Sequence, residues 1–133
     1  MKEGQASRTA ELVCTGRAIA HARQLVPKFS DPTALPLLSA EARESVERFL
    51  KGGKPRDVRE GMLWKIREGQ ARLMALRTVA IDDAVRESAH RQVVILGAGL
   101  DGRAWRMPEL KDAVVFVEVS EASRERLARW VSG

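Results

Sequence analysis

The chain has 133 residues, of which 44% are hydrophobic and 31% charged, with a formal net charge of +5. This composition excludes a disordered chain, and no apolar run approaches the roughly 18 residues of a membrane span. The basic residues are interleaved with acids and accompanied by few aromatic residues, which argues against a nucleic-acid platform. A single cysteine, Cys14, and a polar start without a secretory signal favour a cytoplasmic protein without a metal site.

The first part of the chain has a helical pattern. Residues 7–26 place apolar side chains near one face at helical spacing, namely Leu12, Ile19, Ala22 and Val26. The stretch FSDPTALPLL, at residues 29–38, is expected to be extended and rich in turns, because each proline restricts the residue before it. A short helix is then predicted from Ala40 to about Leu50, and KGGKPR marks a flexible break.

A longer helical pattern begins at Asp57, where Glu60 three residues later is typical of a capping box. Apolar residues keep a helical period over residues 58–79, and the pattern continues over residues 81–89. The sequence therefore predicts a helical N-terminal region over residues 1–91.

The pattern changes at residue 92. Residues 92–96 and 113–119 form short, β-branched runs that are typical of buried parallel strands. A turn at Pro108 separates them, and a further helix is predicted to start at Ser120. Strand, turn and helix in this order predict that residues 92–133 open an α/β domain.

A glycine-rich turn, GAGLDG at residues 97–102, follows the first predicted strand. Its spacing matches GxGxxG, and Glu118 lies about twenty residues downstream, as in a dinucleotide site. Two observations weaken this reading, which stays open as an NAD(P)-binding alternative. Pro108 leaves little room for the long crossover helix of such a site. The negative charge of Asp101 would face a pyrophosphate, which is an unfavourable pairing.

S-adenosyl-L-methionine has different requirements. Glycines permit close backbone approach of its methionine tail, and an acid in the turn suits its ammonium group. An acid at the end of the next strand can accept hydrogen bonds from both ribose hydroxyls. Gly97, Gly99, Asp101 and Glu118 are the right residue types in the right order for this cofactor.

The string LGAGLDGRAWRMP resembles the LGAGLDTRAYRL signature of the leucine carboxyl methyltransferase-like, or PPM-type, S-adenosylmethionine-dependent methyltransferases. Three further stretches agree in order: SRTAELVCTGRA, FSDPTALPLL and LRTVAIDDAVRESAHRQVV. The resemblance implies a class I methyltransferase fold, in which a helical N-terminal region lies over a Rossmann-like parallel sheet. This chain would hold the N-terminal half of that fold, truncated after the second strand and its helix.

The resemblance also implies an activity, the transfer of a methyl group from S-adenosylmethionine to a carboxylate or hydroxyl oxygen, without a metal. The catalytic residues and the methyl acceptor are unknown from the sequence. We expect the truncated half to be inactive alone, because the acceptor pocket of the family lies in the missing part. Because an incomplete sheet exposes unpaired strands, we also expect self-association or a need for a complementing C-terminal fragment. A non-catalytic helical interaction module is the remaining alternative.

Site residues follow from the resemblance position by position. Arg77 matches the family arginine that binds the cofactor carboxylate, and Arg8 sits where the family has a basic residue with a similar task. The expected cofactor-binding set is Arg8, Arg77, Gly97, Ala98, Gly99, Asp101 and Glu118.

Two positions depart from the family pattern. Where the family reads E-x-D after the second strand, this chain reads Glu118-Val-Ser120, so serine replaces the ribose-binding aspartate. Gly102 replaces a threonine and is expected to loosen the glycine turn.

Overall fold

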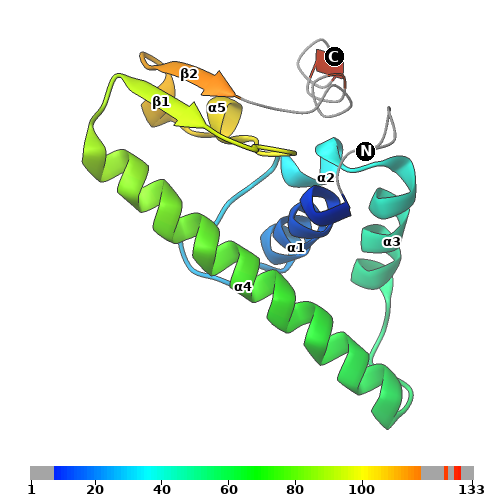
Figure 1. Ribbon diagram of the computed structural model, residues 1–133. Helices are drawn as coiled ribbons and strands as arrows, with labels where there is room; N and C mark the ends of the chain where they lie inside the picture. The colour runs from blue at the N-terminus through cyan, green and yellow to red at the C-terminus, as the bar shows by residue number, and fades with distance from the viewer. Residues whose placement is uncertain (1–7, 118–124, 126–127, 130–133) are drawn as a thin grey trace.

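A computed structural model describes residues 8–117, 125 and 128–129. Its elements are α1 (Arg8–Arg23), α2 (Ala34–Leu37), α3 (Ala40–Lys51), α4 (Val58–Ser88), β1 (Gln92–Ile95), α5 (Arg103–Arg106), a 3₁₀ turn (Pro108–Leu110) and β2 (Val114–Val117). Helices α1 to α4 come first, and the two parallel strands follow with α5 and the 3₁₀ turn between them, so the fold is of the α/β class, as predicted (Figure 1). Glu118, Ser120 and most of the helix predicted after them lie outside the described residues.

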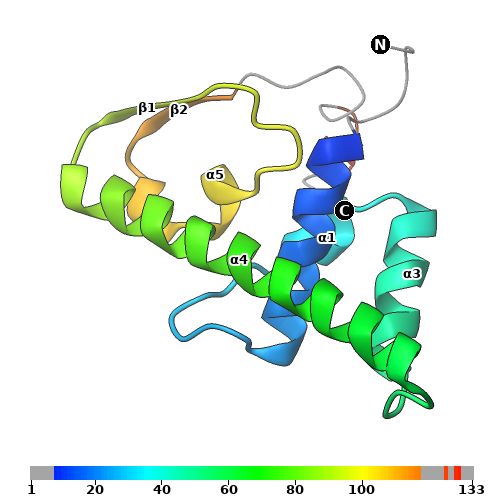
Figure 2. The same cartoon turned by 60° about the horizontal axis from the view of Figure 1, so that its bottom comes forward.

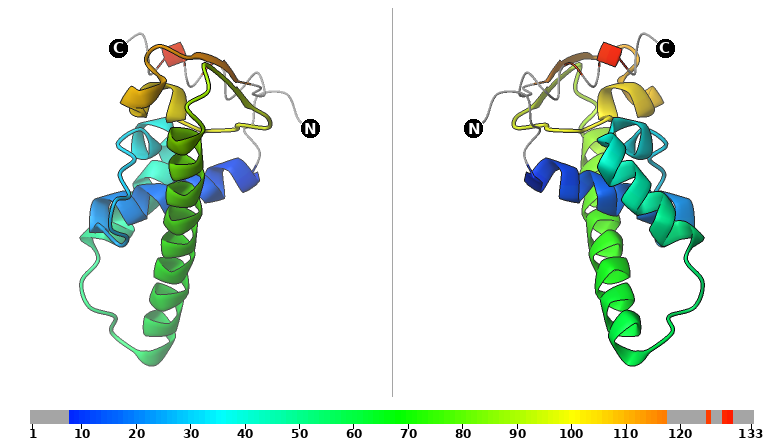
Figure 3. Two further views of the ribbon diagram at one scale, coloured as in Figure 1. Left: turned by 90° about the vertical axis from the view of Figure 1, so that its left-hand side faces the viewer. Right: turned by 90° about the vertical axis from the view of Figure 1, so that its right-hand side faces the viewer.

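The core is centred on α1, which crosses the middle of α4 (Figures 2 and 3) and also packs against α2 and α3. Small residues line this crossing: Ala71 and Ala75 of α4 are 0% exposed, and Gly16 of α1 lies against Met74. Small side chains let the two helix backbones approach closely and leave little room for a large apolar residue. The apolar face predicted for α1 is therefore only partly right, because Ile19 is buried but Leu12 is 61% exposed.

Helix starts agree with their sequence signals. The Ser39 side chain accepts a hydrogen bond from the backbone N–H of Ala42 and caps α3. Asp57 caps α4 in the same way, accepting from Glu60 N–H at 2.8 Å, as predicted. The Glu60 carboxylate accepts from the Arg56 N–H instead of completing the capping box. From Asp57, α4 runs unbroken for 31 residues.

The segment 29–38 differs in part from the expectation of extended, turn-rich chain. Residues 32–33 form a turn, but residues Ala34–Leu37 form the short helix α2, with Pro36 inside it. The missing N–H of Pro36 falls in the first helical turn, where backbone N–H groups have no partner within the helix, so proline is tolerated there.

Within the described residues, two strands form a sheet. β1 and β2 pair in parallel, with a register from Gln92 opposite Val114 to Ile95 opposite Val117. Both were expected to be buried, but Val94 is 61% and Val114 is 53% exposed. Successive side chains of a strand point to opposite faces, and the described helices lie on one side of this sheet (Figure 3). Among the described residues, one face of each strand is therefore open.

Candidate functional site

The glycine loop, residues 97–101, follows β1 directly, as predicted. Gly97 and Gly99 have φ values of 59° and 56°, in the left-handed region that favours glycine. The Asp101 N–H donates to the Ala98 carbonyl at 3.0 Å and closes the turn. A Cβ atom on Gly99 would lie 2.7 Å from the Cβ of Ala10, so glycine also lets the loop lie against α1.

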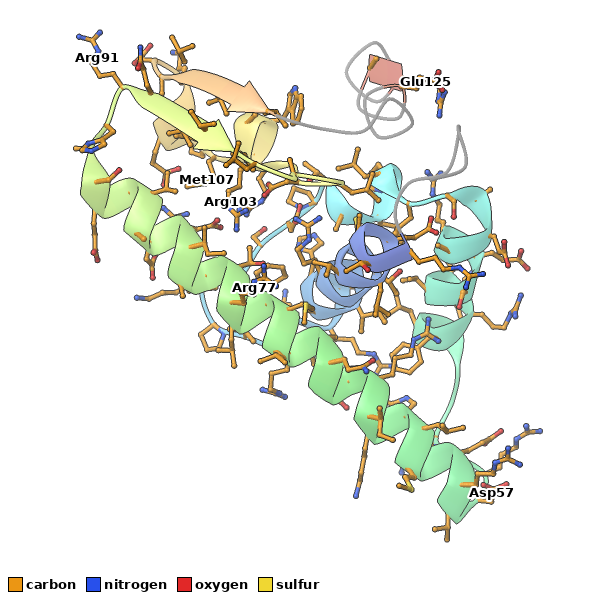
Figure 4. All side chains as sticks on the ribbon, viewed as in Figure 1. Asp57, Arg77, Arg91, Arg103, Met107 and Glu125 are labelled. Atoms are coloured by element: carbon orange, nitrogen blue, oxygen red, sulfur yellow. The ribbon has the colours of Figure 1, made fainter. Side chains whose placement is uncertain are left out.

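A cavity of about 780 Å³ lies between the glycine loop, β1, α4 and the start of α1. Its volume falls in the range of small-molecule sites, about 300–1,000 Å³. Most of its wall is apolar, and its charged lining residues are Arg17, Arg77, Asp101 and Arg103. Figure 4 shows Arg77 midway along α4 and Arg103 between α4 and the strands. The cavity is thus a largely apolar space with four charged lining residues.

The structure brings most of the predicted site residues together. Arg77 lines the same cavity as Gly97, Ala98, Gly99 and Asp101. Its side chain is exposed and makes no hydrogen bond or ion pair with any described residue. Arg8 is exposed at the first residue of α1, beside the lining residue Thr9, and does not itself line the cavity that the described residues form.

Asp101 already has partners within the chain. Its carboxylate accepts from the backbone N–H of Arg103 at 2.8 Å and also pairs with the Arg103 guanidinium. The residue is 8% exposed. It therefore shapes the turn at the start of α5, and a contact with a ligand ammonium group stays a prediction.

Arg103 continues into a buried ion-pair network. Its Nε lies 2.6 Å from Asp82 in α4, and Arg106 donates to both oxygens of the same carboxylate at 2.6 and 3.0 Å. Arg106 also lies 3.7 Å from Asp31, which is 3.2 Å from Arg17 of α1. The network joins three carboxylates to three guanidiniums, so its charges balance; its members are Arg17, Asp31, Asp82, Asp101, Arg103 and Arg106.

The sequence did not predict this network, although every segment on which the family resemblance rests supplies a member. Arg17 comes from SRTAELVCTGRA, Asp31 from FSDPTALPLL and Asp82 from LRTVAIDDA. The glycine loop and α5 supply the remaining three. The available signal was the position of Arg17 within a run of small and apolar residues, where an unpaired charge is too costly to bury.

The pKa shifts agree with this pairing. Burial raises the pKa of Asp82, but hydrogen bonds from Arg106 and Arg103 outweigh burial and hold it below its ordinary value. Burial likewise lowers the pKa of Arg17, while the neighbouring Cys14, Asp31 and Asp101 more than offset this and raise it. Both groups therefore stay charged at neutral pH.

Gly102 corrects a second expectation. A Cβ atom there would lie 1.9 Å from the Oγ1 atom of Thr33, so the turn is closely packed and not loosened. Thr33 in turn donates to Asp31 from its backbone N–H at 3.1 Å and from its hydroxyl at 2.6 Å. Glycine at position 102 thus makes room for the residue that holds Asp31.

Among the described residues, no group of three or more His, Cys, Asp or Glu side chains has the arrangement of a metal site. None of the helices in that part of the chain combines the length and apolar character that crossing a membrane requires.

The sequence of the chain matches known proteins. The family model for leucine carboxyl methyltransferase matches residues 10–124. The chain belongs to this family. The matched range includes α2 to β2, all but the first residues of α1, and every member of the ion-pair network.

The relatives of the chain are longer proteins. One from Mycolicibacterium gilvum is 37% identical over 111 residues, and one from Mycobacterium sp. (strain KMS) is 40% identical over 113 residues. Each match covers 81% of this chain and 36% of the relative, and each relative is named "Putative S-adenosyl-L-methionine-dependent methyltransferase". A similarly named Streptomyces coelicolor protein is 52% identical over 50 residues, which cover 35% of this chain and 16% of the relative. The chain thus spans about a third of the length of these relatives, and no solved structure matches it.

Proposed function

We propose that the cavity beside the glycine loop binds S-adenosyl-L-methionine and that the chain is the cofactor-binding part of a methyltransferase. One observation carries the proposal. Arg77 and the two positive-φ glycines, Gly97 and Gly99, line the same cavity at the end of a parallel strand. The family and the names of the relatives point to the same cofactor.

The charges of the cavity fit the methionine end of this cofactor. Arg17, Asp101 and Arg103 are paired within the ion-pair network, which leaves Arg77 as the cation without an ionic partner among the described lining residues. A guanidinium binds a carboxylate with two parallel hydrogen bonds. Arg77 would therefore hold the cofactor carboxylate, and Asp101 would lie near the ammonium group.

The glycine loop borders the cavity without bulky side chains at its glycines. Gly97 and Gly99 line the cavity, and a Cβ atom on Gly97 would meet no described atom within 4 Å. Apolar side chains of α4 line the opposite wall, among them Met74, Ile81 and Val85. Such a wall excludes water from a bound ligand and strengthens its polar contacts with the charged lining residues.

Bound S-adenosylmethionine supplies a methyl group on a sulfonium that is already activated. The protein's main task is then alignment of donor and acceptor. Within this chain, the glycine loop would fix the methionine end and Arg77 would orient it. We propose an acceptor oxygen on a carboxylate or hydroxyl, in keeping with the family. We place the protein in the cytoplasm, where a single reduced cysteine such as Cys14 is expected.

Two proposed ribose contacts lie outside the described residues. We propose that Glu118 accepts hydrogen bonds from the ribose hydroxyls and that Ser120 weakens this end of the site. The substitution Ser120→Asp would restore the family pattern. A charge-assisted hydrogen bond contributes about 1.5–3 kcal/mol, so affinity should rise by up to about a hundredfold.

The dinucleotide alternative fits less well. The third glycine of a GxGxxG site packs a long crossover helix against its strand. Here α5 has four residues, and Gly102 lies against Thr33 instead. These contacts favour S-adenosylmethionine over NAD(P).

Calorimetric titration of the chain with S-adenosylmethionine, S-adenosylhomocysteine and NAD tests the proposal. We expect saturable binding of the first two ligands and none of NAD at the same concentrations. Tighter binding of NAD would overturn the proposal in favour of a dinucleotide site. If the chain binds none of the three ligands, a non-catalytic interaction module is favoured.

A further inference from the structure

A row of apolar and small residues runs along the outer side of α4. Its members recur at alternating steps of four and three residues: Met62, Ile66, Gly69, Leu73, Leu76 and Ala80. All are exposed, and the four large side chains are between 48% and 66% exposed. This spacing is that of the a and d positions of a coiled coil, so the row is suited to packing against another helix.

The outer row is not the face that packs against α1. An α-helix turns by about 100° per residue, which places Ala71 and Ala75 on the side opposite Leu73 and Leu76. The two alanines are fully buried in the core, whereas the two leucines are exposed. A Cβ atom on Gly69 would meet nothing within 4 Å, so the middle of the row is open. The row therefore keeps both its heptad spacing and its exposure over residues 62–80 of α4.

The charged residues that flank the outer row are all basic. Lys65 and Arg72 lie along one side, although Arg72 also donates to the Leu25 carbonyl, and Arg77, which also lines the cavity, lies along the other. The remaining flanking positions are uncharged: Leu63, Gln70 and Val79. The acids of this stretch are turned elsewhere: Glu60 binds Arg56, and Glu68 lies toward Arg72 and the α1 side of the helix. In a coiled coil these flanking positions face their counterparts on the partner helix.

The positive charge of the residues that flank the outer row determines which kind of partner helix fits. A second copy of this chain would place basic flanks opposite basic flanks in either the parallel or the antiparallel arrangement. An acidic partner would instead form interhelical ion pairs, which set partner choice and orientation. We propose that the outer row of α4 docks an amphipathic helix whose apolar seam is flanked by glutamate or aspartate. Gly69 and Ala80 leave holes for large apolar side chains of that helix.

Two synthetic 21-residue peptides test this proposal by calorimetric titration of the full chain. Both carry leucine at the a and d positions; one has glutamate at the flanking e and g positions and the other has lysine. We expect the glutamate peptide to bind at least tenfold more tightly, with the difference shrinking as salt rises. Equal affinities would overturn the proposal, because the flanks would then select nothing.

Variants locate the docking surface. The double substitution Leu73→Asp with Leu76→Asp should weaken binding of the glutamate peptide at least tenfold. Leu12→Asp is the control, because Leu12 is equally exposed but lies on α1. Circular dichroism checks that each variant stays folded. If the two substitutions on α4 change binding no more than the control, the peptide docks elsewhere and the proposal fails.

Charge reversal gives an independent readout. Lys65 and Gln70 are exposed and make no hydrogen bond or ion pair with any described residue. Replacing both by glutamate lowers the net charge of the residues that flank the outer row from +3 to zero, because Arg72 and Arg77 remain. The preference should then be lost, so that the two peptides bind about equally. Two further results would contradict the proposal. One is a dimer in sedimentation experiments that Leu73→Asp with Leu76→Asp dissociates, and the other is binding to phosphatidylserine vesicles in preference to the peptide.

Discussion

Arg17 of α1 donates a hydrogen bond from its guanidinium to the carbonyl oxygen of Leu100, 83 positions later in the sequence. The same guanidinium lies 3.2 Å from the buried carboxylate of Asp31. Because Leu100 directly follows Gly99, one side chain fixes the glycine loop to the first helix. The position of the loop therefore depends on a buried cation as well as on its own glycines.

Removal of that cation should destabilise the fold. Arg17→Met leaves the carboxylate of Asp31, which is 0% exposed, without its nearest cation. Breaking a buried ion pair from one side costs about 3 kcal/mol or more, because the remaining charge stays buried. We expect urea unfolding to show a loss of this size in the free energy of unfolding. Arg59→Met, at an exposed position on α4, is the control, and an equal loss there would contradict this account.

The same substitution at two glycines should have opposite effects. Gly99→Ala forces a side chain into a left-handed backbone and brings its Cβ to 2.7 Å from Ala10, so we expect a loss of at least about 1 kcal/mol. Gly69→Ala adds a Cβ in open space on a helix and should stabilise by about 1 kcal/mol. Thermal unfolding of the two variants compares them directly. A stabilised Gly99→Ala variant would show that the loop does not need this conformation.

Asp82 should contribute to acid sensitivity. Although burial raises its pKa, hydrogen bonds from Arg106 and Arg103 hold that pKa below the ordinary value. As pH falls, the unfolded state therefore takes up the proton first, near pH 3.9. The stability that Asp82 provides is present above this pH and is lost as pH falls through the folded pKa. In unfolding measurements from pH 6 to 2, Asp82→Asn should lose less stability than the native chain.

The control for that measurement is Glu44→Gln, because Glu44 pairs with Arg48 on the exposed surface of α3. Its acid dependence should match that of the native chain. If Asp82→Asn matches the native chain as well, Asp82 is not held by its arginines in the way described.

Cys14 should act at the other end of the pH range. Burial raises the pKa of its thiol to about 11, with smaller effects from Arg17 and neighbouring acids. The unfolded thiol loses its proton near pH 8.5, so stability falls from there until the folded thiol also ionises. The slope for one proton is about 1.4 kcal/mol per pH unit. Cys14→Ser keeps a donor for the Ala34 carbonyl and should remove this fall; an unchanged alkaline profile would contradict it.

Local signals predicted the elements well. Asp57 caps α4, residues Ala40–Lys51 form α3, and β1 meets the glycine loop where the sequence placed it. These features depend on neighbours within a few positions, so short patterns record them. Periodicity also predicted that α4 is a helix, but not which side is buried. The helix packs on α1 through Ala71 and Ala75, because close backbone approach there favours small residues.

Long-range pairing was beyond the reach of such patterns. Arg17, Asp31, Asp82 and Arg106 are far apart in sequence, and each alone is typical of an exposed helix or turn. Only the fold brings the charges close enough to be buried together. The reverse holds for Arg77, which the family resemblance predicted and which the fold places at the cavity beside the glycine loop.

The central claim is that Arg77 receives the carboxylate of S-adenosylmethionine. The direct measurement is a calorimetric cycle of two proteins, the native chain and Arg77→Gln, with S-adenosylmethionine and its decarboxylated analogue. We predict that the native chain binds the analogue at least tenfold more weakly, as the loss of a charge-assisted hydrogen bond implies. Arg77→Gln should bind both ligands with equal, weak affinity, while Arg59→Gln behaves like the native chain. If Arg77→Gln still favours the ligand with the carboxylate tenfold, Arg77 does not bind that group and the proposed site is wrong.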